Sequence, residues 1–95
     1  SRESVELLEG VLAPLHPDIA IALNNRGTSL TWIRRFDEAE TALRRSREIH
    51  QAVSGPDSLV LAVPFVSLGD LELERGNGTA ALEAYRRARG LIEEN

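Results

Sequence analysis

Hydrophobic residues recur along most of this chain at the three- and four-residue spacing of an amphipathic α-helix. Two such stripes are Ala20, Leu23, Gly27 and Leu30, and then Ala39, Leu43, Ser46, Ile49 and Val53. Segments rich in proline, glycine and polar residues interrupt the spacing at residues 14–17, 34–37, 55–58 and 76–79. The pattern therefore predicts an all-α chain of about five helices, over residues 2–13, 17–33, 37–53, 58–75 and 79–94.

Four residues give specific expectations for where the helices start. Pro17 suits a first helical position, where its missing N–H would have no partner anyway. Asp37 followed by Glu40 has the form of a capping box, so we expect it to start the third helix. Pro64 falls inside the fourth expected helix. Because a proline there removes a hydrogen bond, it should kink this helix or delay its start.

The chain also repeats itself with a period of 42 residues. This offset superposes Gly27 on Gly69, and the Arg-Arg-x-Arg block at 44–47 on the block at 86–89. It also pairs Ala20, Ala39 and Ala42 with Ala62, Ala81 and Ala84, and Arg2, Ser4, Glu6, Val11 and Pro14 with Arg44, Ser46, Glu48, Val53 and Pro56. Such a period indicates a repeat architecture, in which neighbouring units stack to bury their apolar stripes.

Small residues stand where the two helices of one unit would cross. Gly27 and Ala39 in the first unit, like Gly69 and Ala81 in the second, would let the helices approach closely. The larger residues expected around the crossings are Leu23, Leu43, Phe65 and Tyr85. Ser46 would keep the seam to the following helix thin.

Helix–turn–helix units with small residues at the crossing resemble the tetratricopeptide repeat, and the 42-residue spacing resembles its kinesin-light-chain-like type, found in many bacterial proteins. The resemblance rests on residues 16–30, 34–49, 52–58, 59–77 and 79–92. It implies one domain over 1–95, folded as a right-handed superhelical stack of antiparallel helix pairs. Residues 1–15 would be the second helix of a preceding repeat, 16–57 the first full repeat and 58–95 the second.

Three residues depart from the family's pattern. Arg26 stands where the family usually has leucine, and Glu72 where it has an aromatic or apolar residue. Gly78 replaces the aromatic that Phe36 supplies in the first unit. We therefore expect the second unit to be the more loosely packed one.

The resemblance also implies a binding groove, since partners of this family lie along the concave surface built from the first helix of each pair. The positions carried over are Asn24, Asn25, Thr28, Thr31 and Trp32 in the first unit, and Val66, Asp70, Leu73 and Glu74 in the second. The amides of Asn24 and Asn25 could bond a peptide backbone, although Asn25 could instead bond a neighbouring helix. Asp70 and Glu74 share one helical face, which either suits a basic peptide or is merely a solvated acidic face.

Composition excludes several function classes. The 95 residues carry a net charge of −4, which argues against a nucleic-acid partner. Cysteine is absent, and every basic residue is arginine, so thiolate zinc sites, cysteine nucleophiles, Schiff-base lysines and a lysine clamp for a terminal carboxylate are excluded. No apolar stretch approaches the roughly 20 residues that span a bilayer, and no signal peptide is visible, so we expect no membrane partner and a cytoplasmic setting.

The remaining polar residues favour no chemistry. The arginine blocks at 44–47 and 86–89 are expected to form a solvated face with nearby glutamates rather than a nucleic-acid surface. His16 with Asp18 is a weak metal pair and better suited to the start of a helix. We predict no catalytic residue, no cofactor and no metal site.

The sequence thus predicts a non-catalytic protein-interaction module that presents a concave groove to a peptide or helix. The resemblance implies that it is the regulatory or scaffold part of a larger bacterial signalling protein, such as a serine/threonine kinase. The alternative is a purely structural solenoid segment that self-associates. The apolar residues at the two ends would then support a homodimer: Leu7, Leu8, Val11, Leu12, Leu82, Leu91 and Ile92.

Overall fold

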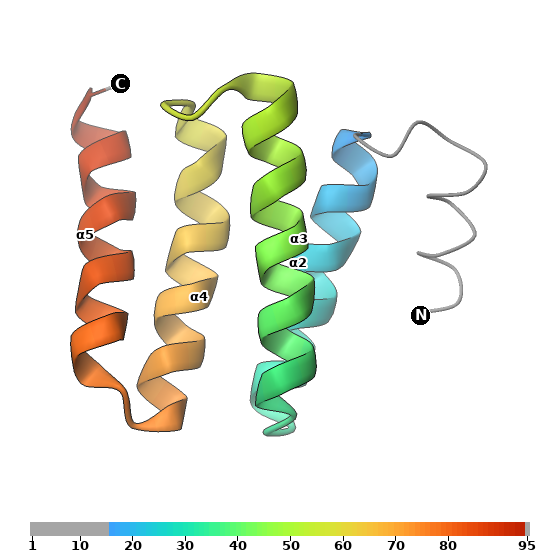
Figure 1. Cartoon of the computed structure of the whole chain (residues 1–95), viewed down its shortest axis with the longest axis vertical. Coiled ribbons are helices and arrows are strands. Elements are labelled where there is room, and N and C mark those ends of the chain that lie inside the picture. Colours follow the sequence, from blue (N-terminus) through green and yellow to red (C-terminus); the bar gives the residue numbers. More distant parts are fainter. Residues whose placement is uncertain (1–15, 95) are drawn as a thin grey trace.

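The computed structural model describes residues 16–94 and shows them as two antiparallel helix pairs (Figure 1). The elements are α2 (Pro17–Trp32), α3 (Phe36–Ser54), a 3-10 turn η1 (Leu59–Leu61), α4 (Ala62–Arg75) and α5 (Gly78–Glu94). Helix α2 packs on α3 and α4 packs on α5, while α4 contacts both helices of the first pair. The all-α stack predicted from the sequence is therefore confirmed over these residues. The helix expected over 2–13 lies outside them.

Pro17 and Pro64 both act as their positions predict. Helix α2 begins at Pro17, and the Nδ1 atom of His16 accepts a hydrogen bond from the backbone N–H of Asp18 at 3.0 Å. Before Pro64 the chain first makes the 3-10 turn and enters α4 only at Ala62. Pro64 therefore falls in the first turn of α4, where its missing N–H breaks no helical hydrogen bond.

The predicted capping box at Asp37 is wrong. Helix α3 begins at Phe36, after an N-cap at Arg35 that makes no side-chain hydrogen bond. The reason lies in the preceding turn, which closes through the backbone when the N–H of Arg35 donates to Leu30 O at 2.9 Å. Asp37 is thereby placed inside the first helical turn, and its carboxylate contacts Arg75 at 3.1 Å instead.

The turns that end α2 and α4 have the same backbone geometry, 42 residues apart. The backbone N–H of Arg34 donates to the carbonyl oxygen of Thr31 at 3.1 Å, and the backbone N–H of Gly76 donates to that of Leu73 at the same distance. Their φ angles are 64° and 88°, both in the left-handed region. Glycine adopts this region freely, whereas a residue with a Cβ gives up about 1–2 kcal/mol there. The first turn is therefore the strained one.

The two glycines at the helix crossings make the close approach that the sequence predicts. A Cβ added to Gly27 would overlap the Leu43 side chain, and one added to Gly69 would lie 2.6 Å from Cε1 of Tyr85. The buried hydroxyl of Ser46 donates to Ala20 O at 2.7 Å, so the side chain predicted to face the following helix packs toward α2 of its own pair. The 42-residue period thus marks positions of real steric constraint.

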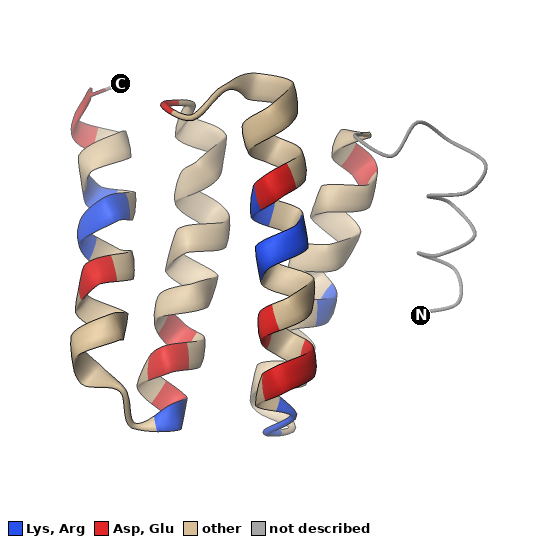
Figure 2. Cartoon of the chain, in the orientation of Figure 1, with Lys and Arg blue, Asp and Glu red and all other residues tan. Residues whose placement is uncertain are grey.

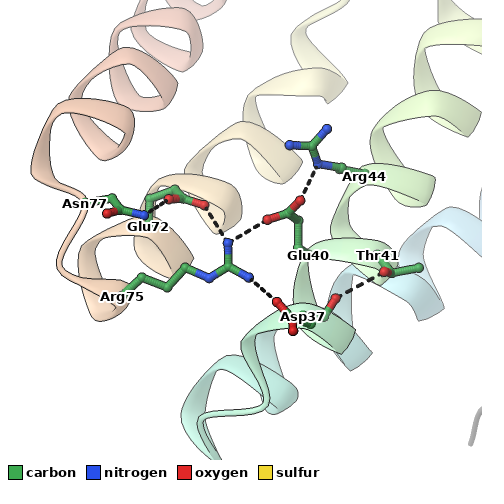
Figure 3. A network of polar contacts seen from close by, with 7 residues as sticks. All are labelled: Asp37, Glu40, Thr41, Arg44, Glu72, Arg75 and Asn77. Carbon is green, nitrogen blue, oxygen red and sulfur yellow. Dashed lines mark hydrogen bonds and ion pairs between the residues drawn. The ribbon is translucent and has the colours of Figure 1, made fainter.

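A network of ion pairs joins the two helix pairs at the end where α4 turns into α5 (Figure 3). Arg75 lies between the pairs, with its guanidinium 2.6 Å from Glu40 and 3.1 Å from Asp37 of α3. It also contacts Glu72 on its own helix, at 3.4 Å. Glu72 in turn accepts a hydrogen bond from Asn77 at 2.8 Å. The departure from the family pattern at Glu72 is therefore compensated by charge, where apolar packing was expected.

The arginine blocks only partly behave as a solvated face. Arg44 pairs with Glu40 at 3.0 Å, and Arg45 with Glu48 at 3.6 Å. Arg47 and Arg87, however, lie over the ring of Phe65 at 5.9 and 5.8 Å from its centroid. Arg47 therefore contributes to the packing between the pairs and Arg87 to the packing within the second pair, which their charge alone did not predict.

Candidate functional site

A hollow of about 180 Å³ lies between α2 and α4, on the surface formed by the first helix of each pair. We call it the α2–α4 pocket. Its lining residues are Thr28, Thr31 and Trp32 from α2, and Ser67, Asp70, Leu73 and Glu74 from α4. The lining thus combines an aromatic ring, a leucine, three hydroxyls and two carboxylates.

On α2, the two threonines of the pocket form hydrogen bonds within the helix, whereas Trp32 is exposed. The hydroxyl of Thr31 is buried and donates to Gly27 O at 2.9 Å, and the hydroxyl of Thr28 donates to Asn24 O at 3.0 Å. Both donors are used within the helix, so these side chains offer a partner their oxygens and methyl groups. Trp32, in contrast, ends the helix with 76% of its surface exposed.

The wall supplied by α4 holds a carboxylate in a fixed position. The hydroxyl of Tyr85, on α5, donates to Oδ1 of Asp70 at 2.5 Å. This hydrogen bond, then burial and the charges of Asp70 and Glu74, raise the pKa of Tyr85 to about 12. The neutral phenol is thus stabilised as a donor, and the Asp70 carboxylate is oriented by a residue outside the pocket.

Charge is unevenly distributed along α4 (Figure 2). The helix carries no charged residue between Ala62 and Gly69, and its acidic residues gather in the turns before α5. Among residues 16–94, no arginine lines the α2–α4 pocket. Arg34 approaches one of its carboxylates from outside the lining, with Nη1 3.6 Å from Oε2 of Glu74. The pocket is therefore an acidic hollow with a cation at its edge.

The structure brings together six of the nine groove positions that the resemblance implied. These six line the pocket: Thr28, Thr31, Trp32, Asp70, Leu73 and Glu74. That they bind a partner stays a prediction.

Asn24 and Asn25 lie on α2 before the pocket and do not line it. Asn25 is exposed, whereas Asn24 is half-buried and its Oδ1 accepts no hydrogen bond. A buried acceptor without a donor is destabilising by about 1–3 kcal/mol.

The sequence did not indicate three residues that belong to the site or contact it. Ser67 stands 42 positions after Asn25, so the period alone could have placed it on the groove face. Tyr85 was assigned only to the helix crossing, and nothing in the sequence shows that its hydroxyl reaches Asp70. Arg34 belongs to a turn, and its left-handed φ required the structure.

The described residues support no metal site. Between residues 16 and 94, no three histidine, aspartate or glutamate side chains come together as a metal would need. Among the helices of this part, none is long and apolar enough to cross a membrane.

The side chain of His50, on α3, is buried and does not line the pocket. This burial lowers the pKa of His50.

Antiparallel helix pairs with a 42-residue period, stacked so that their first helices form one surface, define a helical-repeat protein. The family model of the tetratricopeptide repeat matches residues 18–94, and the chain belongs to this family. Comparisons with curated proteins and with solved structures gave no match. Tetratricopeptide repeats are generic protein–protein interaction modules. The class of function to consider for the α2–α4 pocket is therefore protein binding.

Proposed function

We propose that the surface formed by α2 and α4 binds a peptide or helix of a partner protein, and that it does so without catalysis. The observation that carries this proposal is the α2–α4 pocket, built jointly by both repeats, with the exposed side chains of Trp32 and Leu73 in its lining. Large exposed apolar side chains beside positioned polar groups are typical of interaction surfaces.

The size of the pocket indicates what kind of ligand fits. Its volume of about 180 Å³ is below the range of about 300–1,000 Å³ found for small-molecule sites. It suits a single side chain. Further exposed apolar residues continue the same helical faces away from the pocket: Ile21 on α2, and Val63 and Val66 on α4. A partner segment would therefore insert one side chain and lie along the rest of this surface.

A peptide library displayed on phage, selected against the chain, tests the proposal directly. We expect selected peptides to lose binding to Leu73→Asp, because this change places a charge at the pocket wall. Asn24→Ala and Asp70→Ala should also lose binding while circular dichroism shows unchanged helicity. Leu82→Asp is the matched control, since Leu82 is about as exposed as Leu73 but lies on α5. Equal binding to all four variants would refute the proposed groove.

One observation favours the alternative of self-association. On α5, Leu82 and Ile92 are 49% and 57% exposed, whereas their counterparts 42 residues earlier, Glu40 and His50, are partly or fully covered in the stack. The α5 surface is thus equivalent to a surface that is packed in the first repeat. Light scattering over a range of concentrations, with Leu82→Asp as the interface variant, tests this. A strict monomer at the highest concentration would remove it.

The finer assignment extends the resemblance to the kinesin-light-chain-like type and to a bacterial signalling protein such as a serine/threonine kinase. Its support is the 42-residue spacing, which is maintained from Ala20–Ala62 to Arg47–Arg89. The sequence encoded upstream of Ser1 tests this part of the proposal, which predicts a kinase or other signalling domain in the same reading frame.

A further inference from the structure

We infer that the side chain inserted into the α2–α4 pocket is an arginine of the partner. This inference rests on the proposed function and specifies the chemistry of its ligand. It is carried by the charge of the pocket, by the aromatic ring in its lining and by a guanidinium of the protein itself that lies at its rim.

Two carboxylates and one indole meet in the pocket. Asp70 and Glu74 lie one helical turn apart on α4, and both are exposed. Within the described part of the chain, no basic residue lines the pocket with them. Trp32 lines the same pocket from α2. A planar guanidinium can hydrogen-bond to carboxylates while it stacks on an aromatic face, which a compact ammonium does less well. The lining therefore complements an arginine in both charge and shape.

The protein's own Arg34 already shows the attraction. Its Nη1 lies 3.6 Å from Oε2 of Glu74, although the two residues belong to different repeats. Both side chains are largely open to solvent, and such pairs contribute little free energy. Arg34 is also held in a left-handed conformation at a turn where the second repeat has Gly76. A partner arginine can therefore displace this contact at little cost.

Asp70 is preorganised for the same task. Tyr85 bonds its Oδ1 atom at 2.5 Å and leaves Oδ2 to accept from a ligand. Because the carboxylate is already oriented, less side-chain freedom is lost when a guanidinium binds. Tyr85 is thus a positioning residue of the pocket and does not itself line it.

The single tryptophan makes the test direct, since Trp32 lines the pocket and its fluorescence reports on binding there. The probe is a short acetylated and amidated peptide of alanine and serine with a central arginine between two leucines. Its partner probe carries citrulline, which has nearly the same shape without the charge. We expect a saturable change in fluorescence with the arginine peptide and about tenfold weaker binding of the citrulline peptide.

Charge variants distinguish binding in the pocket from general electrostatic attraction to the acidic protein. Asp70→Asn with Glu74→Gln should weaken binding of the arginine peptide about tenfold. The control, Glu38→Gln with Glu83→Gln, changes the net charge equally at exposed positions of α3 and α5 and should leave binding unchanged. Arg34→Gly removes the internal competitor and should strengthen binding about threefold, with helicity retained.

Three results would overturn the inference: equal affinity for the arginine and citrulline peptides, an equal loss in the control pair, or no saturable change with the arginine peptide. The displayed library distinguishes this failure from failure of the groove itself. Selected peptides that depend on Leu73 but carry no arginine would refute the inference and leave the proposed function standing. If no selected peptide depends on the groove, both are wrong.

Discussion

The two helix crossings of this protein use the same small residue against different neighbours. At the first, Gly27 packs on Leu43, which is fully buried. At the second, Gly69 packs on the ring of Tyr85, which is partly exposed and bonds Asp70 at the edge of the α2–α4 pocket. The packing side chain of the first crossing is apolar and closed in, whereas that of the second, Tyr85, reaches the candidate site through its hydroxyl. A repeat can therefore keep its crossing geometry while one position of the packing layer acquires a polar role.

The turns between the two helices of each repeat differ in the same direction. In the first, Phe36 packs against the core and lies beneath the guanidinium of Arg34, 4.9 Å from the ring centroid. In the second, Gly78 stands at the equivalent position, and a Cβ added there would meet no atom within 4 Å. The nearby Glu72 bonds Arg75 and Asn77 instead. Polar contacts thus replace apolar ones in the second repeat.

The largest effect expected from this comparison is at the glycines. Gly27→Ala should destabilise the fold by about 1–3 kcal/mol, because buried Leu43 has no space into which it can move. Gly69→Ala should destabilise it less, since the exposed part of the Tyr85 ring can swing outward. Urea unfolding followed by circular dichroism measures both. Equal losses would mean that the two crossings are equally closed.

The next effect concerns the ion-pair network of Figure 3. Arg75→Gln should cost about 1–2 kcal/mol, because the Arg75 side chain is only 20% exposed and its loss leaves Glu72 without its cation and Glu40 with Arg44 alone. The control is Arg89→Gln, which breaks an exposed pair with Glu93 and should change stability by less than about 0.5 kcal/mol.

Salt provides a second measurement on these two variants. The difference in stability between the Arg75 variant and the unmodified chain should persist in high salt, since partly buried pairs are screened less than exposed ones. If the Arg75 and Arg89 variants lose equal stability, the network does not hold the repeats together.

The smallest effect is the titration of Tyr85, the only tyrosine of the chain. Its absorbance should titrate with a pKa of about 12, and Asp70→Asn should move that pKa back toward 10. Glu74→Gln should lower the pKa less, because Glu74 acts on Tyr85 through its charge alone. The raised pKa stabilises the fold fully below pH 10, and this contribution is lost as the pH rises toward 12. A pKa of 10 in the unmodified chain would mean that the hydrogen bond to Asp70 is absent.

Several local features could be read from the sequence because they depend on neighbours in the chain. Pro17 starts a helix and Pro64 delays one because both lack an N–H, whatever surrounds them. The groove positions Thr28 and Asp70 were implied by the resemblance to the tetratricopeptide repeat, and they stand 42 residues apart. The capping box at Asp37 failed because a turn closed by backbone hydrogen bonds fixed the start of α3 two residues after Arg34.

The helices, the 42-residue period and the small residues at the crossings were predictable before the fold was known, because they depend on spacing along one chain. Which polar groups meet depends on how the helices pack. Tyr85 reaches Asp70, Arg34 reaches Glu74, and Arg75 joins α3 to α4. Each of these contacts joins residues of different helices or turns, so its geometry is set by how closely the helices stack. The candidate pocket arises in the same way, since α2 and α4 each supply only one of its walls.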